Sequence, residues 1–271
     1  NDKKHRKKGT YMKQKVGILG VGHLASYMVK GMMRHDDRPE IILSPRGAIV
    51  AQHLSETYDL EIAKSNETLV EQCDVVLLAT RPPDLLEAIS GLPWRADQTA
   101  ISVAAGVALP GIERAVSPAT AIRSLPVTAA EIGESPTCLY PENSTARTLL
   151  EMMGPVYALD NEKTFELASI QGVVFSVFHA GIASVADWFE QNGLEPTMAR
   201  NLAASALRAT GGMVLEHPEN SFDHMINEYA SPGTLTKLAL ETLQKNGGLS
   251  GWHDALDKAQ NRSLEINKST Q

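Results

Sequence analysis

The chain of 271 residues has little cysteine, an excess of acid over base, and no long apolar run. Its two cysteines, Cys73 and Cys138, have no metal-ligand spacing, so we expect no metal site. Both lie beside or within apolar stretches, which is typical of buried thiols. Only two cysteines in a chain of this size fit a reducing compartment, and we expect a cytoplasmic protein. No segment has about 18 uninterrupted apolar residues, so we expect no membrane span.

The charge balance narrows the choice of partners. A formal net charge of −7 argues against a general nucleic-acid binder. Seven lysines and arginines nevertheless crowd the first fifteen positions, and no apolar segment follows them as it would in a secretory signal. We interpret residues 1–14 as a disordered leader or an added tag, with a functional basic arm as the alternative.

The first half of the chain alternates short apolar runs with helical patterns. We expect strands at 16–19, 41–43, 61–63, 74–79, 99–103, 119–123 and 137–140, and helices at 23–34, 47–58 and 144–153. Strands that alternate with helices imply parallel crossovers and a doubly wound α/β sheet. We assign residues 15–160 to this Rossmann-type domain.

The pattern changes near residue 160, and helical signals dominate the rest of the chain. One helix is predicted from about 163 to 192, with a break, and Gly193 is placed to cap it. A second opens at Pro196 and a third spans about 234–245. We therefore predict an all-helical domain over residues 161–271. Its helices could form a subunit interface or an ordinary helical core, and the sequence favours neither.

The first predicted strand ends in a glycine motif, Gly20-Val21-Gly22-His23-Leu24-Ala25. This is the G-x-G-x-x-A form of the dinucleotide fingerprint, in the strand–turn–helix context that it requires. Gly20 permits a tight turn, Gly22 lets the backbone approach a pyrophosphate, and Ala25 allows close packing of helix on strand. The phosphates would lie on the free N–H groups at the helix start.

The second strand ends in Ser44-Pro45-Arg46, with no acid to bind a ribose 2′-hydroxyl. A hydroxyl and a guanidinium suit a 2′-phosphate, which favours NADP, although a surface arginine in a turn is the alternative. Two further strand ends, Ala79–Pro82 and Ser102–Val107, fall at the carboxyl edge where ligands of such sheets bind. Ordinary turn chemistry explains these two equally well.

A Ser-Pro-Gly turn at Ser231–Gly233 leads into the predicted helix at 234–245. Its free N–H groups and the hydroxyls of Ser231, Thr234 and Thr236 could receive a carboxylate. On these residues alone, a plain N-cap by Ser231 or Thr234 is the better interpretation.

Taken in order, these motifs resemble those of the pyrroline-5-carboxylate reductase family over residues 15 to about 266. The resemblance rests on Gly20–Ala25, Ser44–Arg46, Ala79–Pro82, Ser102–Val107, Arg123–Thr128, Gly133-Glu134 and Ser231–Thr236. It implies a Rossmann-type NADP-binding domain followed by an all-helical dimerisation domain. It also implies a homodimer or higher homo-oligomer, with the active site between the nucleotide domain and the helical dimer.

The resemblance further implies a reaction and roles for individual residues. The expected reaction is hydride transfer from NADPH, with NADH as the alternative cofactor, to 1-pyrroline-5-carboxylate, a small cyclic imine acid that becomes proline. The cofactor residues would be Gly20, Gly22, His23, Leu24 and Ala25 at the pyrophosphate, Ser44 and Arg46 at the 2′-phosphate, and Ala79, Arg81, Pro82, Ala104 and Gly106 along the cleft. The substrate residues would be Val127, Ser231, Gly233 and Thr234, with Thr236 as the catalytic contact to the imine nitrogen region.

The chain departs from the family pattern at several of these places. His23 and Val127 each stand where the family usually has asparagine, and Thr234 replaces a glycine. The bulky stretch 171–176 replaces a run of small residues. These departures leave open a paralogue that reduces a different imine or keto acid, and a dinucleotide-binding sensor without catalysis.

Overall fold

A computed structural model of the protein describes residues 14–269, which form two compact units. The sheet unit comprises residues 14–169 and 263–269, and the helical unit comprises residues 170–262. The predicted leader lies outside the described residues, apart from Gln14. Along the chain, the helical unit begins after residue 169. The domain boundary that the sequence predicts between residues 160 and 161 stays a prediction.

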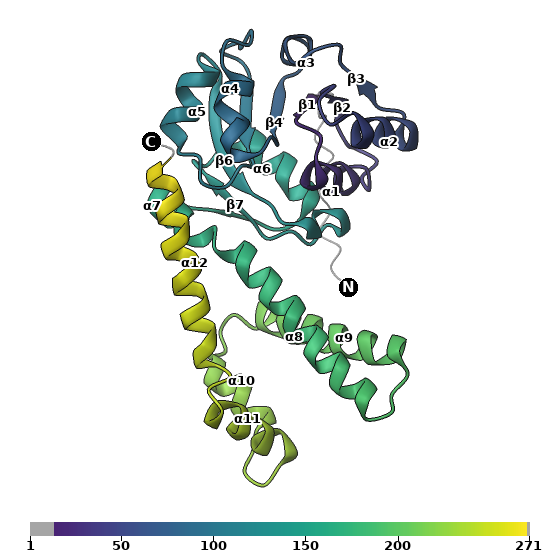
Figure 1. The fold of residues 1–271 in the computed structure, drawn as a ribbon, viewed down its shortest axis with the longest axis vertical. Helices are drawn as coiled ribbons and strands as arrows, with labels where there is room; N and C mark the ends of the chain where they lie inside the picture. The colour runs from purple at the N-terminus through teal and green to yellow at the C-terminus, as the bar shows by residue number, and fades with distance from the viewer. Residues whose placement is uncertain (1–13, 270–271) are drawn as a thin grey trace. The chain divides into compact units, whose positions relative to one another are not determined.

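The sheet unit is built on one eight-stranded sheet with the order β3-β2-β1-β4-β5-β6-β7-β8 (Figure 1). The strands are β1 Lys15–Leu19, β2 Glu40–Leu43, β3 Glu61–Ile62, β4 Val75–Leu78, β5 Thr99–Ser102, β6 Thr120–Leu125, β7 Thr137–Tyr140 and β8 Val156–Ala158. Strands β1 to β6 are parallel, and the order reverses between β1 and β4, so their carboxyl ends share one edge with a topological switch point.

Two features at the far side of the sheet differ from the purely parallel arrangement that the sequence predicts. Strand β7 pairs with β6 in antiparallel fashion, because only a short 3₁₀ helix, Thr128–Ile132, lies between them rather than a full crossover. Strand β8 was not predicted; its three residues form the outer strand, parallel to β7, and leave Tyr157 exposed.

Alternate residues of the central strands point to two separate cores, as a doubly wound sheet requires. The helices are α1 His23–Met32, α2 Ala48–Tyr58, α3 Asn66–Gln72, α4 Leu85–Ile89, α5 Leu109–Val116, α6 Ser144–Leu150 and α7 Glu162–Ala168, with further 3₁₀ turns at Pro82–Asp84 and Glu151–Met153. Helices α1, α2 and α6 cover one face, whereas α3, α4 and α5 cover the other. The predicted fold class is confirmed.

The helical unit confirms the expected absence of strands in the C-terminal part of the described chain. Its helices are α8 Gln171–Gln191, α9 Pro196–Glu216, α10 Phe222–Tyr229, α11 Leu235–Lys245 and most of α12 Ser250–Ser269. The predicted break falls between α7 and α8, Gly193 follows the end of α8 with φ +95°, and Pro196 opens α9.

Large apolar side chains of the helical unit remain exposed while small ones are buried. Where α8 packs against α9, the buried residues are alanines, among them Ala186 and Ala203. Trp188 is 60% exposed and Leu215 is 72% exposed. An apolar surface of this kind is typical of an interface with another molecule.

Length and composition alone would let the stretch Glu162–Gln191 cross a membrane. The structure divides that stretch into two helices at residues 169–170, and α7 belongs to the sheet unit. A single apolar stretch is weak evidence for a span, and the expectation of no membrane contact stays a prediction.

Candidate functional site

The glycine turn connects β1 to α1 at the switch point of the sheet. Gly20 has φ +94°, and a Cβ on it would lie 2.8 Å from the backbone nitrogen of Thr80. Only glycine fits this conformation and this approach. The Gly20 amide donates to Ser44 Oγ at 2.9 Å, and the Val21 amide donates to the Arg46 carbonyl at 3.3 Å. The end of β2 therefore holds the turn in place.

The start of α1 is open to an anion. Gly22 is its N-cap residue, no side chain caps the helix, and the first turn carries no acidic residue. A Cβ on Gly22 would meet no heavy atom within 4 Å, so there is space beside the backbone. His23 is exposed, Leu24 is half-buried and Ala25 is buried against the sheet. These uncapped N–H groups fit the pyrophosphate of a dinucleotide.

Two arginines share one carboxylate beyond the ends of β2 and β4. Arg46 Nη2 lies 3.7 Å from Asp84 Oδ2, and Arg81 Nη2 lies 3.0 Å from the same oxygen. The two arginine side chains are 63% and 83% exposed, so they can turn toward a phosphate at little desolvation cost. Asp84 is a member of this cluster that the sequence did not single out.

Ser44 has a different environment from the one that the sequence predicts. Its side chain is fully buried, and its Oγ accepts the hydrogen bond from Gly20. The contact of Ser44 with a 2′-phosphate stays a prediction, and this burial argues against it. Sequence reasoning missed the role that the structure gives this hydroxyl, which is to fix the glycine turn.

A cavity of about 330 Å³ lies next to Arg46, at the end of the site where the adenosine of a dinucleotide would bind. It is lined by Arg46, Asn66, Glu67, Asp84, Glu87, Ala88, Ser90 and Leu92. Its volume is within the range of small-molecule sites.

The predicted cleft residues of β4 and β5 follow neighbouring strands on the same edge. Ala79 donates its amide to the Leu19 carbonyl at 2.8 Å, which continues the ladder beyond β4, and Pro82 begins the next 3₁₀ turn. Ala104 is buried, its amide donates to Ser102 Oγ at 3.3 Å, and Gly106 has φ +76°. Residues this small at the carboxyl edge are compatible with a flat ring lying against the backbone.

Val127 follows the end of β6, at the same carboxyl edge of the sheet. It is half-buried, and its amide donates to Ser135 Oγ at 2.9 Å. An apolar side chain therefore stands at the position where the family resemblance implies a polar one.

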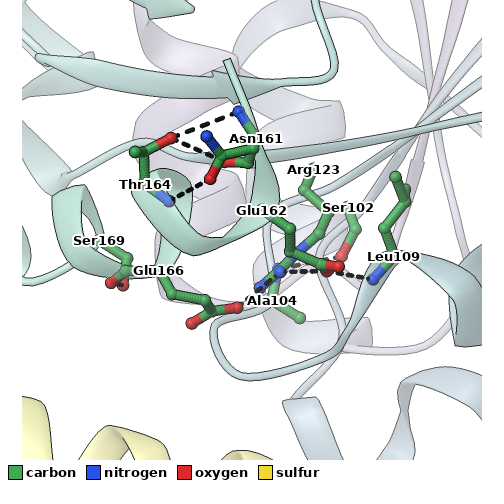
Figure 2. Close-up of polar contacts among 9 residues, drawn as sticks. All are labelled: Ser102, Ala104, Leu109, Arg123, Asn161, Glu162, Thr164, Glu166 and Ser169. Atoms are coloured by element: carbon green, nitrogen blue, oxygen red, sulfur yellow. Dashed lines mark hydrogen bonds and ion pairs between the residues drawn. The ribbon is translucent and has the colours of Figure 1, made fainter. Parts of the chain in front are cut away.

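A buried cation lies under this edge, and sequence reasoning assigned it no role. Arg123 of β6 is 1% exposed, and its Nη1 lies 2.8 Å from Glu162 Oε1 and 2.6 Å from Glu166 Oε1 (Figure 2). The guanidinium carbon lies 4.6 Å from the centroid of the Phe165 ring. Glu162 Oε1 also accepts the Leu109 amide at 2.7 Å. We name these charged residues, Arg123, Glu162 and Glu166, the arginine cluster.

The remaining predicted residues lie in the helical unit, around the start of α11. Gly233 has φ +82°, and Thr234 is the N-cap, whose Oγ1 accepts the Lys237 amide at 3.2 Å and donates to the Ser231 carbonyl at 2.7 Å. Ser231, Gly233, Thr234 and Thr236 are all exposed. The N-cap interpretation is confirmed, and the exposed turn remains accessible to a carboxylate.

Both cysteines are free and buried. Burial raises the pKa of the Cys73 thiol to about 12, and it also raises the pKa of the Cys138 thiol. Neither thiol is suited to act as a nucleophile near neutral pH.

Two family profiles match this chain, one in each part of the sequence. Residues 15–106 match the family described as NADP oxidoreductase coenzyme F420-dependent. Residues 163–266 match the family described as pyrroline-5-carboxylate reductase dimerisation.

Individual relatives are similar over nearly the whole chain. Pyrroline-5-carboxylate reductase 1 of Bacillus subtilis is 28% identical, over 94% of this chain and 90% of the relative. The crystal structure of 1-pyrroline-5-carboxylate reductase from Streptococcus pyogenes has a TM-score of 0.80 at 25% identity, covering 92% of this chain and 98% of that one. The Plasmodium falciparum pyrroline carboxylate reductase with NADP bound has a TM-score of 0.81 at 21% identity, covering 94% and 99%, and shows the shared fold.

A single added methyl group should have different effects at the two fingerprint glycines, Gly20 and Gly22. Gly22→Ala meets open space and an extended backbone, so the free energy of unfolding should change by less than about 0.5 kcal/mol. Dinucleotide affinity should fall about tenfold or more, because the methyl group occupies the approach to the helix amides. Gly20→Ala should instead lower the melting temperature. Calorimetric titration and thermal unfolding of both variants test this; an unchanged dinucleotide affinity in Gly22→Ala would contradict it.

Proposed function

Because the chain belongs to the pyrroline-5-carboxylate reductase family, we propose that it is an NAD(P)-dependent oxidoreductase that reduces 1-pyrroline-5-carboxylate to proline. The observation that carries the proposal is the uncapped start of α1 behind the Gly20 turn, with open space beside Gly22. Such a helix start would receive a pyrophosphate, and the rest of a dinucleotide would then lie along the carboxyl edge.

The cofactor that fits is NADP(H), with NAD(H) as a weaker alternative. Arg46 and Arg81 would bind the 2′-phosphate as an anion in competition with Asp84, and the end of β2 offers no acid for a ribose diol. Ala104 and Gly106 would lie near the nicotinamide, which supplies the hydride when the cofactor is bound.

The substrate carboxylate would be received by the turn before α11. The hydroxyl of Thr234 already donates to Ser231 and accepts from Lys237, so backbone N–H groups of the turn and the Ser231 hydroxyl are the available donors. Thr236, one residue into α11, would hydrogen-bond the nitrogen region of the imine. Orientation and the exclusion of bulk water would supply most of the acceleration. The proton would come from solvent or would already be present on the imine.

The exposed apolar surface of the helical unit would be buried in a homodimer or a higher homo-oligomer. Its match to the dimerisation family supports this, as do the exposed Trp188 and Leu215. Two buried free thiols agree with the cytoplasm as the location. No nucleic-acid or membrane partner is part of the proposal.

A second candidate substrate is a different imine or keto acid. It is favoured by the half-buried Val127 and by the apolar residues Val173, Val174 and Phe175 at the start of α8, where the family has small residues. Bulky apolar groups near a reacting ring would change which ring the site accepts.

The function is tested by NADPH consumption with 1-pyrroline-5-carboxylate beside imine acids of smaller and larger ring size. We expect 1-pyrroline-5-carboxylate to have the highest kcat/KM. A faster turnover of another imine would establish the second candidate. Cofactor binding without oxidation of NADPH on any substrate would indicate a sensor.

Arg46→Ala should separate the two cofactors. Loss of a hydrogen bond to a charged group costs about 1.5–3 kcal/mol, so NADPH affinity should fall about 10–100-fold while NADH affinity changes little. Arg114→Ala, at an exposed arginine of α5, is the control. An equal loss for both cofactors, measured by fluorescence titration, would remove the 2′-phosphate role.

Thr236→Ala should lower kcat about tenfold or more with unchanged affinity for NADPH, because the contact is made only to the reacting imine. Thr242→Ala, on the same helix, removes a hydroxyl that donates to the Leu238 carbonyl and serves as the control. Steady-state kinetics test this prediction, and a wild-type kcat in Thr236→Ala would contradict the catalytic contact of Thr236.

A further inference from the structure

The arginine cluster joins β6 to α7 through buried charge, which has a large desolvation cost. Arg123 places a single nitrogen, Nη1, against both carboxylates, while its Nε and Nη2 are buried without a hydrogen-bond partner in the described part of the chain. Buried ion pairs contribute little to stability compared with apolar residues of similar volume. The cluster is therefore better explained by the segment that it holds in place than by its contribution to stability.

What it fixes is the end of the loop after β5. This loop, residues 103–108, carries Ala104 and Gly106 and ends where α5 begins at Leu109. The Leu109 amide belongs to the first turn of α5 and has no partner inside that helix. Glu162 Oε1 accepts it at 2.7 Å, while Arg123 Nη1 lies 2.8 Å from the same oxygen. At the other end, Ser102 Oγ holds the Ala104 amide at 3.3 Å.

Figure 2 shows Glu162 reaching from α7 to both Arg123 and Leu109, with Glu166 one turn further along the helix. The two carboxylates thus differ in their contact with the loop. Glu162 contacts the cation and the loop, whereas removal of Glu166 would leave the Glu162–Leu109 hydrogen bond in place.

We propose that Glu162, oriented by Arg123, is a positioning residue that sets the loop 103–108 against the nicotinamide. The inference rests on the proposed function, since it assumes that Ala104 and Gly106 lie beside that ring. Most of the cofactor's binding energy would come from the phosphate contacts at α1 and Arg46. Displacement of the loop should therefore slow hydride transfer more than it weakens binding.

The test compares Glu162→Ala with Glu166→Ala, since each removes one carboxylate from the same guanidinium. In protein without cofactor, amide exchange in the segment 103–109 should be about tenfold faster in Glu162→Ala, and within about threefold of wild type in Glu166→Ala. Glu162→Gln retains an oxygen acceptor for the Leu109 amide and should restore slow exchange. This measurement does not depend on activity.

With NADPH and the best imine, Glu162→Ala should lower kcat about 10–100-fold, and the isotope effect with 4-deuterated NADPH should rise as hydride transfer becomes limiting. The Kd for NADPH should change less than about threefold. Equal effects of Glu162→Ala and Glu166→Ala, or unchanged exchange at 103–109, would overturn the proposal. If the alanine variants do not fold, Glu162→Asp and Glu166→Asp give the same comparison. A wild-type protein that oxidises no NADPH would instead refute the proposed function, and the exchange experiment would still stand.

Discussion

The approach of the Gly20 turn to the backbone of Thr80 is the constraint on which the site depends. A side chain at Gly20 would lie 2.8 Å from the Thr80 nitrogen, so β1 and β4 can meet at the switch point only with glycine there. That approach sets where α1 starts and where its uncapped amides point. Ser44 then ties the end of β2 to the same turn through a buried hydrogen bond. Three strand ends are thereby fixed around one uncapped helix start.

The two units differ in how much of their apolar surface they bury. The sheet unit buries its apolar residues on both faces of the sheet and has two complete cores. The helical unit buries mainly alanines and leaves large side chains such as Leu235, at 85% exposure, in solvent. The sheet unit therefore has complete cores, whereas the helical unit keeps an exposed apolar surface. Assembly with a second copy would supply the missing cover, in agreement with the match of this segment to a dimerisation family.

Charge is placed differently at the two ends of the proposed cofactor site. Arg46 and Arg81 are exposed and share Asp84, so this pairing is weak and can be exchanged for a ligand phosphate. Arg123 is 1% exposed, with its Nη1 against Glu162 and Glu166 and its guanidinium beside the Phe165 ring, so moving it would leave two partly buried carboxylates without their cation. The exposed arginines suit recognition, whereas the enclosed one suits fixing a loop.

The sequence by itself determined the local features: the glycine fingerprint, most strand and helix positions, the break before α8 and the N-cap of α11 at Thr234. Each of these is written in residues that are close together in the chain, through periodicity, glycine conformation or capping. Only the tertiary structure decided that β7 runs antiparallel, that β8 exists, that Ser44 is buried, and that Glu162 joins Arg123 to Leu109. Arg123 and Glu162 are 39 positions apart, and Leu109 and Glu162 are 53 apart. No local pattern records such a contact, because it arises only when separate elements pack around the same buried charge.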